Sequence, residues 1–342
     1  MGRGLAALSG RKLPIFFKFD TIQLSDFIGG NNLNEKIKKI VDQVKTVILD
    51  KDEVIVKVLS SWLAGGHVLL EDYPGTGKTI LSRALSQATN CSFSRVQFTP
   101  DLLPSDILGV SIYNQKTSEF DFHQGPIFTS FLLGDEINRA TPKTQSALLE
   151  AMSEGQISVE GHRFKLDPMF FVMATQNPIE QLGTFELPEA QLDRFMMKIS
   201  MGYPSPEFEI KMVKDQLQGH PVESLKPVVS KQEVMELKAL SQNIKVTDDI
   251  YGYISKLVQL TRSNEAFKLG VSPRGMIALV KASQALSLCM GMDYVKPSVV
   301  QALLPEVFGH RVLLTPEAHL KGLVPSQVLN EIIKNVPVPR GD

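Results

Sequence analysis

Residues 67–79 constrain the fold of this chain more than any other stretch, because they combine a strand, a glycine turn and the start of a helix. Residues 68–70 are an apolar run of the kind that forms a short buried strand. The turn that follows contains Gly75 and Gly77, and glycine tolerates backbone angles that other residues avoid. Lys78 then opens a run of helix-forming residues. This order is the context that a phosphate-binding loop requires.

Such a loop binds phosphate through consecutive backbone N–H groups and the positive end of the new helix. Lys78 would neutralise the β- and γ-phosphates, and the hydroxyl of Thr79 would hold Mg²⁺. Asp72 stands where the simple pattern has glycine. The alternative is an ordinary glycine-rich turn between a strand and a helix. We predict nucleotide contacts from Asp72, Tyr73, Pro74, Gly75, Thr76, Gly77, Lys78, Thr79 and Ile80.

Two later apolar runs also end in polar residues. Residues 131–134 lead into Asp135 and Glu136, and residues 169–174 lead to Asn177. Parallel α/β sheets bind ligands at the carboxyl ends of their strands. Asp135 would therefore hold Mg²⁺ through water, Glu136 would activate the attacking water, and Asn177 would orient it. Taken alone, the acids could instead be a charge pair at a helix N-terminus, and Asn177 an Asx turn before proline.

Two arginines are further candidates. Arg194 lies just before the last apolar strand and could stabilise transition-state charge on the nucleotide of a neighbouring subunit. A local ion pair with Asp193 or Glu189 is the alternative. Arg274 follows Ser272 and a proline that would cap and open a helix, so it could swing toward a nucleotide or simply be exposed.

The length of 342 residues suggests about two domains. We predict an N-terminal arm (1–19), an α/β nucleotide-binding domain (20–203) and a smaller, all-helical lid (204–342). The first domain would hold a five-stranded parallel sheet with helices on both faces, in the manner of P-loop NTPases. Hairpins are expected at 110–122 and 156–166. No strand is expected beyond residue 203, and the last helix, near Val300, should break or kink at Pro305.

The amino-acid composition narrows the class of protein to which this chain can belong. Hydrophobic residues make up 43% of the chain and charged residues 21%, as in soluble globular proteins. With 36 basic against 37 acidic residues, the chain lacks the basic excess of general nucleic-acid binding proteins. Cys91 and Cys289 are far apart and lack metal-ligand spacing, which fits a reducing compartment. No run is long enough to span a membrane and no signal-peptide core is present, so we expect a cytoplasmic protein.

Six motifs occur together and in order, and with them the chain resembles the MoxR family of AAA+ ATPases from about residue 27 to residue 340. They are PGTGKT (74–79), FTPDLLPSD (98–106), DEINRA (135–140), QSALLEAM (145–152), ATQNP (174–178) and LPEAQLDRF (187–195). Gly134 and Gly309 depart from the pattern, which usually has alanine and arginine there.

The resemblance implies residue roles. Lys78 and Thr79 match the Walker A pair, and Asp135 and Glu136 match the Walker B pair. Asn177 matches sensor 1. The remaining matches are Arg194 with the arginine finger, Arg274 with sensor 2, and Ile28 and Gly29 with the segment that lines the adenine. The two hairpins resemble the helix-2 and pre-sensor-1 inserts of this clade.

The resemblance also implies an activity and partners. Family members use ATP and Mg²⁺, form rings that are usually hexameric, and act as chaperones. They work with partners that carry a von Willebrand factor A domain, in maturing complexes or inserting metal cofactors. Three alternatives remain open: the ATPase subunit of a magnesium-chelatase-like complex, a nucleotide-gated scaffold with little turnover, and a DNA-translocating motor. Glu136 and Arg194 argue against the scaffold, and the near-neutral charge argues against the motor.

Overall fold

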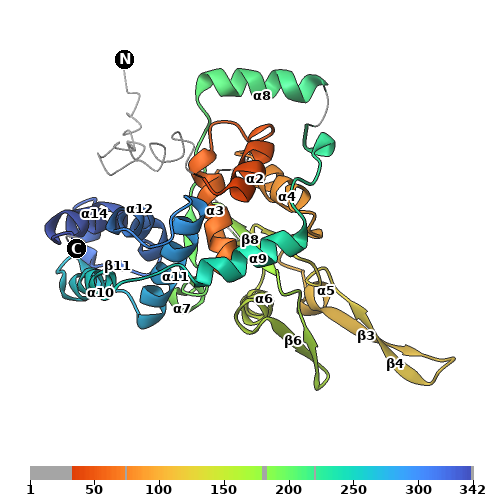
Figure 1. Cartoon of the computed structure of the whole chain (residues 1–342). Coiled ribbons are helices and arrows are strands. Elements are labelled where there is room, and N and C mark those ends of the chain that lie inside the picture. The colour runs from red at the N-terminus through yellow and green to blue at the C-terminus, as the bar shows by residue number, and fades with distance from the viewer. Residues whose placement is uncertain (1–32, 74, 179–182, 219–220, 340–342) are drawn as a thin grey trace, which may run out of the picture.

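The computed structural model describes residues 33–73, 75–178, 183–218 and 221–339 (Figure 1). Its centre is a five-stranded sheet with the order β2-β5-β8-β1-β9, in which all neighbouring strands are parallel. The strands are β1 (Val68–Glu71), β2 (Phe93–Gln97), β5 (Phe131–Asp135), β8 (Phe171–Gln176) and β9 (Met197–Ile199). The predicted five-stranded parallel sheet is therefore confirmed.

Helices cover both faces of this sheet, as the sequence predicted. Successive strand residues point to opposite faces, so Leu132 of β5 packs in one hydrophobic cluster while Phe131 and Leu133 pack in the other. The cluster that contains Phe131 and Leu133 also contains the buried faces of α2 (Glu35–Lys45), α3 (Asp52–Leu63) and α4 (Lys78–Ala88). The cluster that contains Leu132 also contains the buried face of α6 (Pro142–Glu154), which follows the short 3-10 helix η1 (Ile137–Arg139).

Buried aromatic rings join the helices to the sheet. Trp62 of α3 contacts Phe131 and Phe171 with ring centroids 4.4 and 6.1 Å apart, and its indole nitrogen donates to Met169 O. Gly134, the departure near the end of β5, has its own packing reason. A Cβ at that position would lie 3.2 Å from the ring of the buried Phe98.

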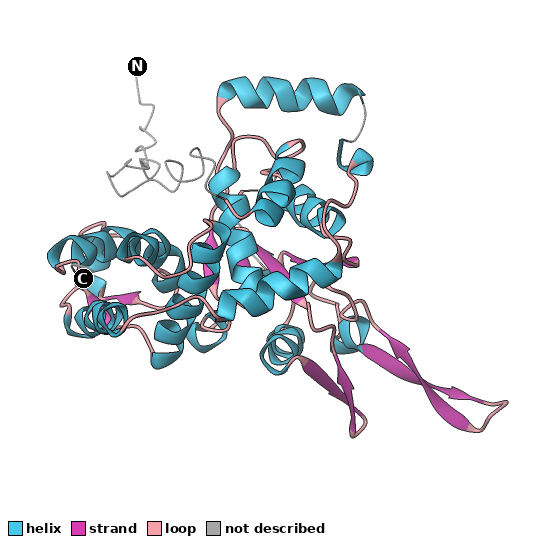
Figure 2. Ribbon diagram, viewed as in Figure 1, coloured by secondary structure: helices cyan, strands magenta, loops and turns pink. Residues whose placement is uncertain are grey.

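Two antiparallel hairpins project from the sheet domain (Figures 1 and 2). One consists of β3 (Gly109–Asn114) and β4 (Glu119–Gln124) after α5 (Pro104–Leu108), and the other of β6 (Gln156–Val159) and β7 (His162–Lys165). Their bases are joined, because the rings of Phe122 and Phe164 stack with centroids 4.2 Å apart. Both hairpins were predicted from the sequence.

The C-terminal region is mostly helical, with one correction. Contrary to the sequence prediction, strands occur here, because β10 (Phe267–Leu269) and β11 (Leu313–Leu314) pair as a small antiparallel sheet. Strands of three and two residues are too short to show the alternation of apolar and polar side chains by which a strand is predicted. The helices are α8 (Pro206–Gln218), η2 (Pro221–Ser224), α9 (Lys231–Gln242), α10 (Asp248–Ser263), α11 (Pro273–Cys289), α12 (Pro297–Phe308), α13 (Pro316–Leu320) and α14 (Pro325–Asn335), with α7 (Glu189–Leu192) preceding β9.

The helix that contains Pro305 is not broken there, since it runs on to Phe308. Contrary to expectation it is also not the last helix, because α13 and α14 follow it. The buried α12 side chains, Leu303 and Leu304 among them, belong to the same hydrophobic cluster as α3. Tertiary packing thus outweighs the missing N–H of the proline.

The helical region packs tightly against the sheet domain. The buried ammonium of Lys57 on α3 pairs with Glu306 on α12, and with Glu53 at 2.7 Å. Burial lowers the pKa of Lys57, but the two carboxylates more than offset this, so that its pKa is raised. Within the described residues, no helix combines the length and the apolar character needed to cross a membrane. The proposed boundary at residue 204 falls between β9 and α8.

The pH dependence of stability should follow from His67. Its Nδ1 accepts from Val172 N and its Nε2 donates to Met152 O, both at 3.0 Å. Burial lowers its pKa to about 4 from an ordinary 6.5. The neutral ring is thus favoured in the fold, so its stabilisation is complete above pH 6.5 and is lost as the pH falls toward 4. We expect the free energy of unfolding in urea to fall by up to about 3 kcal/mol across this window.

The comparison is with His67→Gln, which cannot titrate. This variant should keep only the pH dependence of other groups, including His310, whose pKa burial also lowers. An equal slope in both proteins between pH 6.5 and 4 would contradict the assignment.

Candidate nucleotide site

The glycine turn joins β1 to α4 in the way that the sequence predicted. Gly75 and Gly77 have φ angles of +83° and +90°, and Gly77 is the N-cap of α4. These angles are favourable only for glycine, and they leave the loop backbone uncovered by side chains at the helix N-terminus. The predicted contact residues Pro74, Ile28 and Gly29 lie outside the described residues.

Lys78 lies over this loop. Its Nζ donates to the carbonyl oxygens of Asp72 (2.7 Å) and Tyr73 (2.9 Å), which uses two of the three donors of an ammonium group. Burial lowers the pKa of Lys78, and the charges of Asp72, Asp135 and Glu136 oppose that shift. The lysine therefore lies close to the acidic pair, as a phosphate-binding site needs.

The acidic pair is oriented by the neighbouring strand. Thr175 of β8 donates to Asp135 Oδ1 (2.6 Å), and its hydroxyl accepts from Glu136 N (2.8 Å). Glu136 has φ +57° and ψ +51°, a left-handed conformation that is unusual for a residue other than glycine. Such strain persists where the surroundings hold it, often at functional sites. Asn177, which follows β8, is buried at the same sheet edge.

Two residues of β2 that sequence reasoning missed also hold the acids. Arg95 Nη2 donates to Asp135 Oδ2 (2.6 Å), and Gln97 Nε2 donates to Glu136 Oε2 (2.7 Å). Arg139 Nη1 donates to the same oxygen of Glu136 at 2.9 Å. The signal was the period-two spacing of Arg95 and Gln97 at the end of a strand, but it needed the strand order, in which β2 lies beside β5. In this arrangement one oxygen of the Glu136 carboxylate, Oε2, accepts both hydrogen bonds.

Asp72 faces away from the loop toward the segment after β9. Its Oδ2 accepts from the backbone N–H groups of Met201 and Gly202, both at 2.6 Å, and from Ser200 Oγ at 3.3 Å. Its Oδ1 accepts from Tyr73 N at 3.0 Å. We predicted Asp72 as a nucleotide contact, whereas in the described structure its buried carboxylate ties the loop to residues 200–202.

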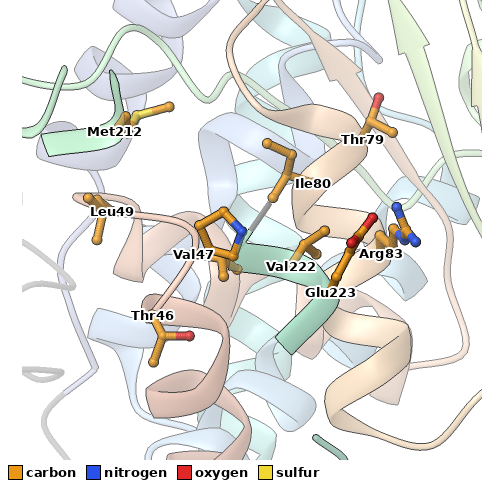
Figure 3. A pocket seen from close by; sticks show the side chains of 10 residues that line it. Thr46, Val47, Leu49, Thr79, Ile80, Arg83, Met212, Val222 and Glu223 are labelled. Carbon is orange, nitrogen blue, oxygen red and sulfur yellow. The ribbon is translucent and has the colours of Figure 1, made fainter. Parts of the chain in front are cut away.

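A cavity of about 360 Å³ lies beside the first turn of α4 (Figure 3). Its walls are largely apolar, and the apolar lining residues are Val47, Leu49, Ile80, Met212 and Val222. Thr79 belongs both to this wall and to the predicted metal ligands, so the cavity adjoins the phosphate loop. Its size and apolar walls suit a flat heterocyclic base. The remaining lining residues are Thr46, Arg83, Pro221 and Glu223.

The two candidate arginines lie at the other edge of the sheet. Arg194 precedes β9, and the register pairs Met197 with Val68 at the start of β1, whereas the glycine loop follows its end. A four-residue strand of about 13 Å therefore separates the two levels. Arg194 Nη1 donates to Leu149 O (2.6 Å) and to Ser153 Oγ (3.0 Å) of α6. The alternative, a local ion pair with Asp193 or Glu189, is therefore not what the structure shows.

Arg274 lies near Arg194 rather than near Lys78. It is in the first turn of α11, two residues after Ser272, whose Oγ donates to Asp193 Oδ2 (3.1 Å). Asp193 is the chain neighbour of Arg194. The structure thus brings Lys78, the acids and Asn177 to one edge, and Arg194 and Arg274 to the opposite edge.

The residues present fit a magnesium nucleotide. The loop offers N–H groups and Lys78 to phosphate, while Thr79 and Asp135 offer the oxygen ligands that Mg²⁺ prefers. Among the described residues, no group of three His, Cys, Asp or Glu side chains forms a metal site.

The role of Asp72 can be tested by comparing two isosteric substitutions in acids that both bind residues 200–205. Asp72→Asn should lower the free energy of unfolding by about 2 kcal/mol, because buried charge-assisted bonds are lost and an N–H donor now faces N–H donors. Asp50→Asn loses only an exposed contact to Ser205 N (3.2 Å) and should cost less than about 0.5 kcal/mol. Equal effects in urea denaturation would contradict the buried tether.

Family models and relatives match this chain over most of its length. A model of the ATPase family associated with various cellular activities (AAA) matches residues 67–197, and an AAA lid domain matches residues 259–332. The chain is 49% identical to the protein YeaC of Bacillus subtilis over 308 residues, covering 90% of this chain and 96% of YeaC. It is 39% identical over 313 residues to the Chaperone MoxR1 of Mycobacterium tuberculosis, covering 89% of this chain and 82% of that one.

Two further comparisons extend the likeness. The Protein MoxR of Paracoccus denitrificans is 31% identical over 321 residues, covering 86% of this chain and 93% of the relative. A crystal structure from Cytophaga hutchinsonii, described provisionally as that of an ATPase, superposes with a TM-score of 0.84 at 35% identity, covering 93% of this chain and 98% of that one. Sequence, fold and motifs thus agree that the chain belongs to the MoxR family of AAA+ ATPases.

Proposed function

We propose that this chain hydrolyses ATP to ADP and phosphate. Copies of the chain would form a ring, as the usually hexameric members of the family do, and each nucleotide would lie between two neighbouring copies. One observation carries the proposal. Lys78 and the acids lie at one edge of the sheet, and Arg194 lies at the other, more than a strand length away. A single copy therefore cannot bring all of them to one nucleotide, but head-to-tail packing of copies can.

Each group at the nucleotide edge has a physical task. The loop N–H groups and Lys78 bind the phosphates, and the apolar cavity beside Ile80 takes the adenine. Thr79 and Asp135 hold Mg²⁺, which when bound draws electron density from the γ-phosphate. Glu136 accepts a proton from the attacking water, which Asn177 orients. Gln97 and Arg139, which donate to Oε2 of Glu136, orient this carboxylate at the nucleotide edge.

Arg194 and Arg274 of a second copy complete the site. Their guanidinium groups stabilise the charge that develops on the transferred phosphoryl group. In the described part of the chain, Arg194 donates to a carbonyl and a hydroxyl of α6, neither of which carries a charge. A phosphate offers a guanidinium stronger bonds than these neutral groups do.

The biological role follows from the family. Because a 39% identical relative is named a chaperone, we propose that hydrolysis remodels or matures partner proteins. The family resemblance further supports a partner protein with a von Willebrand factor A domain. It also supports a role for this chain and that partner in the insertion of metal cofactors. The projecting hairpins are also what a magnesium-chelatase-like subunit would have, and a metal-porphyrin partner would favour that function instead.

The first experiment measures ATP turnover per chain against protein concentration. We expect a steep rise with concentration, because a dilute monomer lacks the arginines. Glu136→Gln and Arg194→Ala should each lose about 10³-fold or more in turnover. Both variants should still bind a fluorescent ATP analogue, whereas Lys78→Ala should not.

A mixture of the two inactive variants tests whether the arginine acts between copies. An Arg194→Ala copy keeps its own nucleotide edge, and a Glu136→Gln copy can supply the missing arginine. The mixture should therefore regain turnover that neither variant has alone. Turnover that is independent of concentration, or a mixture that stays inactive, would contradict the shared site.

A further inference from the structure

A buried arginine, Arg311, donates hydrogen bonds to backbone carbonyls on both sides of Arg194. The side chain of Arg311, which follows α12, is only 2% exposed. Its donors reach Asp193 Oδ1 (2.6 Å), Asp193 O (3.1 Å), Phe195 O (2.6 Å), Met196 O (3.0 Å) and Val307 O. We call residues 193–196 the finger segment. Four of these five bonds end on it.

Two more residues of the helical region hold the same segment. His310 Nε2 bonds Phe195 O at 3.0 Å, and Ser272 Oγ donates to Asp193 Oδ2 at 3.1 Å. Both His310 and Arg311 are buried. The backbone around Arg194 is thus fixed by residues that lie more than 75 positions further along the chain.

The side chain of Arg311 also packs against the start of α11, which carries Arg274. A Cβ built on Gly275 would lie 2.7 Å from Arg311 Cδ and 2.6 Å from Val271 Cγ1. The helix backbone therefore rests directly on the stem of Arg311. Burial lowers the pKa of Arg311, Asp193 raises it, and the nearby charge of Arg274 lowers it, which agrees with the closeness of the two arginines.

We propose that Arg311 is a positioning residue that sets Arg194 and Arg274 together, as one unit, for the nucleotide of a second copy. The inference rests on the proposed function, since it concerns the arginines that act between copies. A guanidinium suits this task because its planar, fixed donors can hold a carboxylate and several carbonyls at once. Any shift of the helical region then moves both arginines in step.

The main variant is Arg311→Lys, which keeps the charge beside Asp193 but cannot reach all the carbonyls. Turnover of this variant should fall at least tenfold, while its affinity for a fluorescent ATP analogue should stay within about twofold. Its own nucleotide edge is intact, so an equal amount of Glu136→Gln copies should restore turnover.

A matched control breaks a different buried contact between the same two regions. Glu306→Gln weakens the pair between the Glu306 side chain and Lys57 of α3. It should lower thermal stability as Arg311→Lys does but should keep most of the turnover. If Arg311→Lys does not fold, Ser272→Ala disturbs the same unit more mildly, because it removes only the bond to Asp193 and the cap of α11, and the same loss and rescue are expected of it.

Three results would overturn the proposal. They are full turnover in Arg311→Lys, loss of its own nucleotide binding, and loss of turnover that Glu136→Gln copies do not restore. The mixture of Arg194→Ala with Glu136→Gln is run beside it. If that mixture regains turnover and the Arg311→Lys mixture does not, the shared site stands and the positioning role of Arg311 fails.

Discussion

All five strands of the central sheet run in the same direction, and this decides which side chains can meet. The strand ends deliver Asp72, Asp135, Glu136 and Asn177 to one edge, beside the glycine loop. Residues that precede a strand are sent to the opposite edge, and Arg194 is one of them. The separation of acids and arginines is thus a consequence of strand polarity, and no side-chain rotation within one copy can undo it.

The helical region is then constrained by its packing on this sheet. Helices α9, α11 and α12 share one hydrophobic cluster with α3 and the sheet, and the buried pairs of Lys57 with Glu306 and Arg311 with Asp193 cross the same contact. Separating these surfaces would leave buried charges without partners, which is costly. The region therefore behaves as an extension of the sheet domain at the arginine edge.

Much of the fold was predictable because its signals are local. Apolar runs gave the parallel strands, glycines gave the loop, and turn residues gave both hairpins. The small β10–β11 sheet was missed because a two-residue strand has no pattern. Arg95 and Gln97 were missed because their role depends on β2 lying beside β5, a fact of topology. The place of Arg274 could not be predicted either, since a capped helix start does not say which edge of the sheet it reaches.

Asp72 shows how a departure from a motif can have a cause outside it. A glycine at this position is needed only where a side chain would obstruct the loop. Here the side chain points away, toward Met201 and Gly202, whose N–H groups would otherwise be buried after β9 without a strand neighbour. A carboxylate satisfies both, while the carbonyl of the same residue accepts from Lys78. One residue therefore links the phosphate loop to the segment that leads into α8, whose Met212 lines the cavity beside α4. The departure from the motif at Asp72 is thus explained by a hydrogen-bonded connection between the loop and the segment after β9.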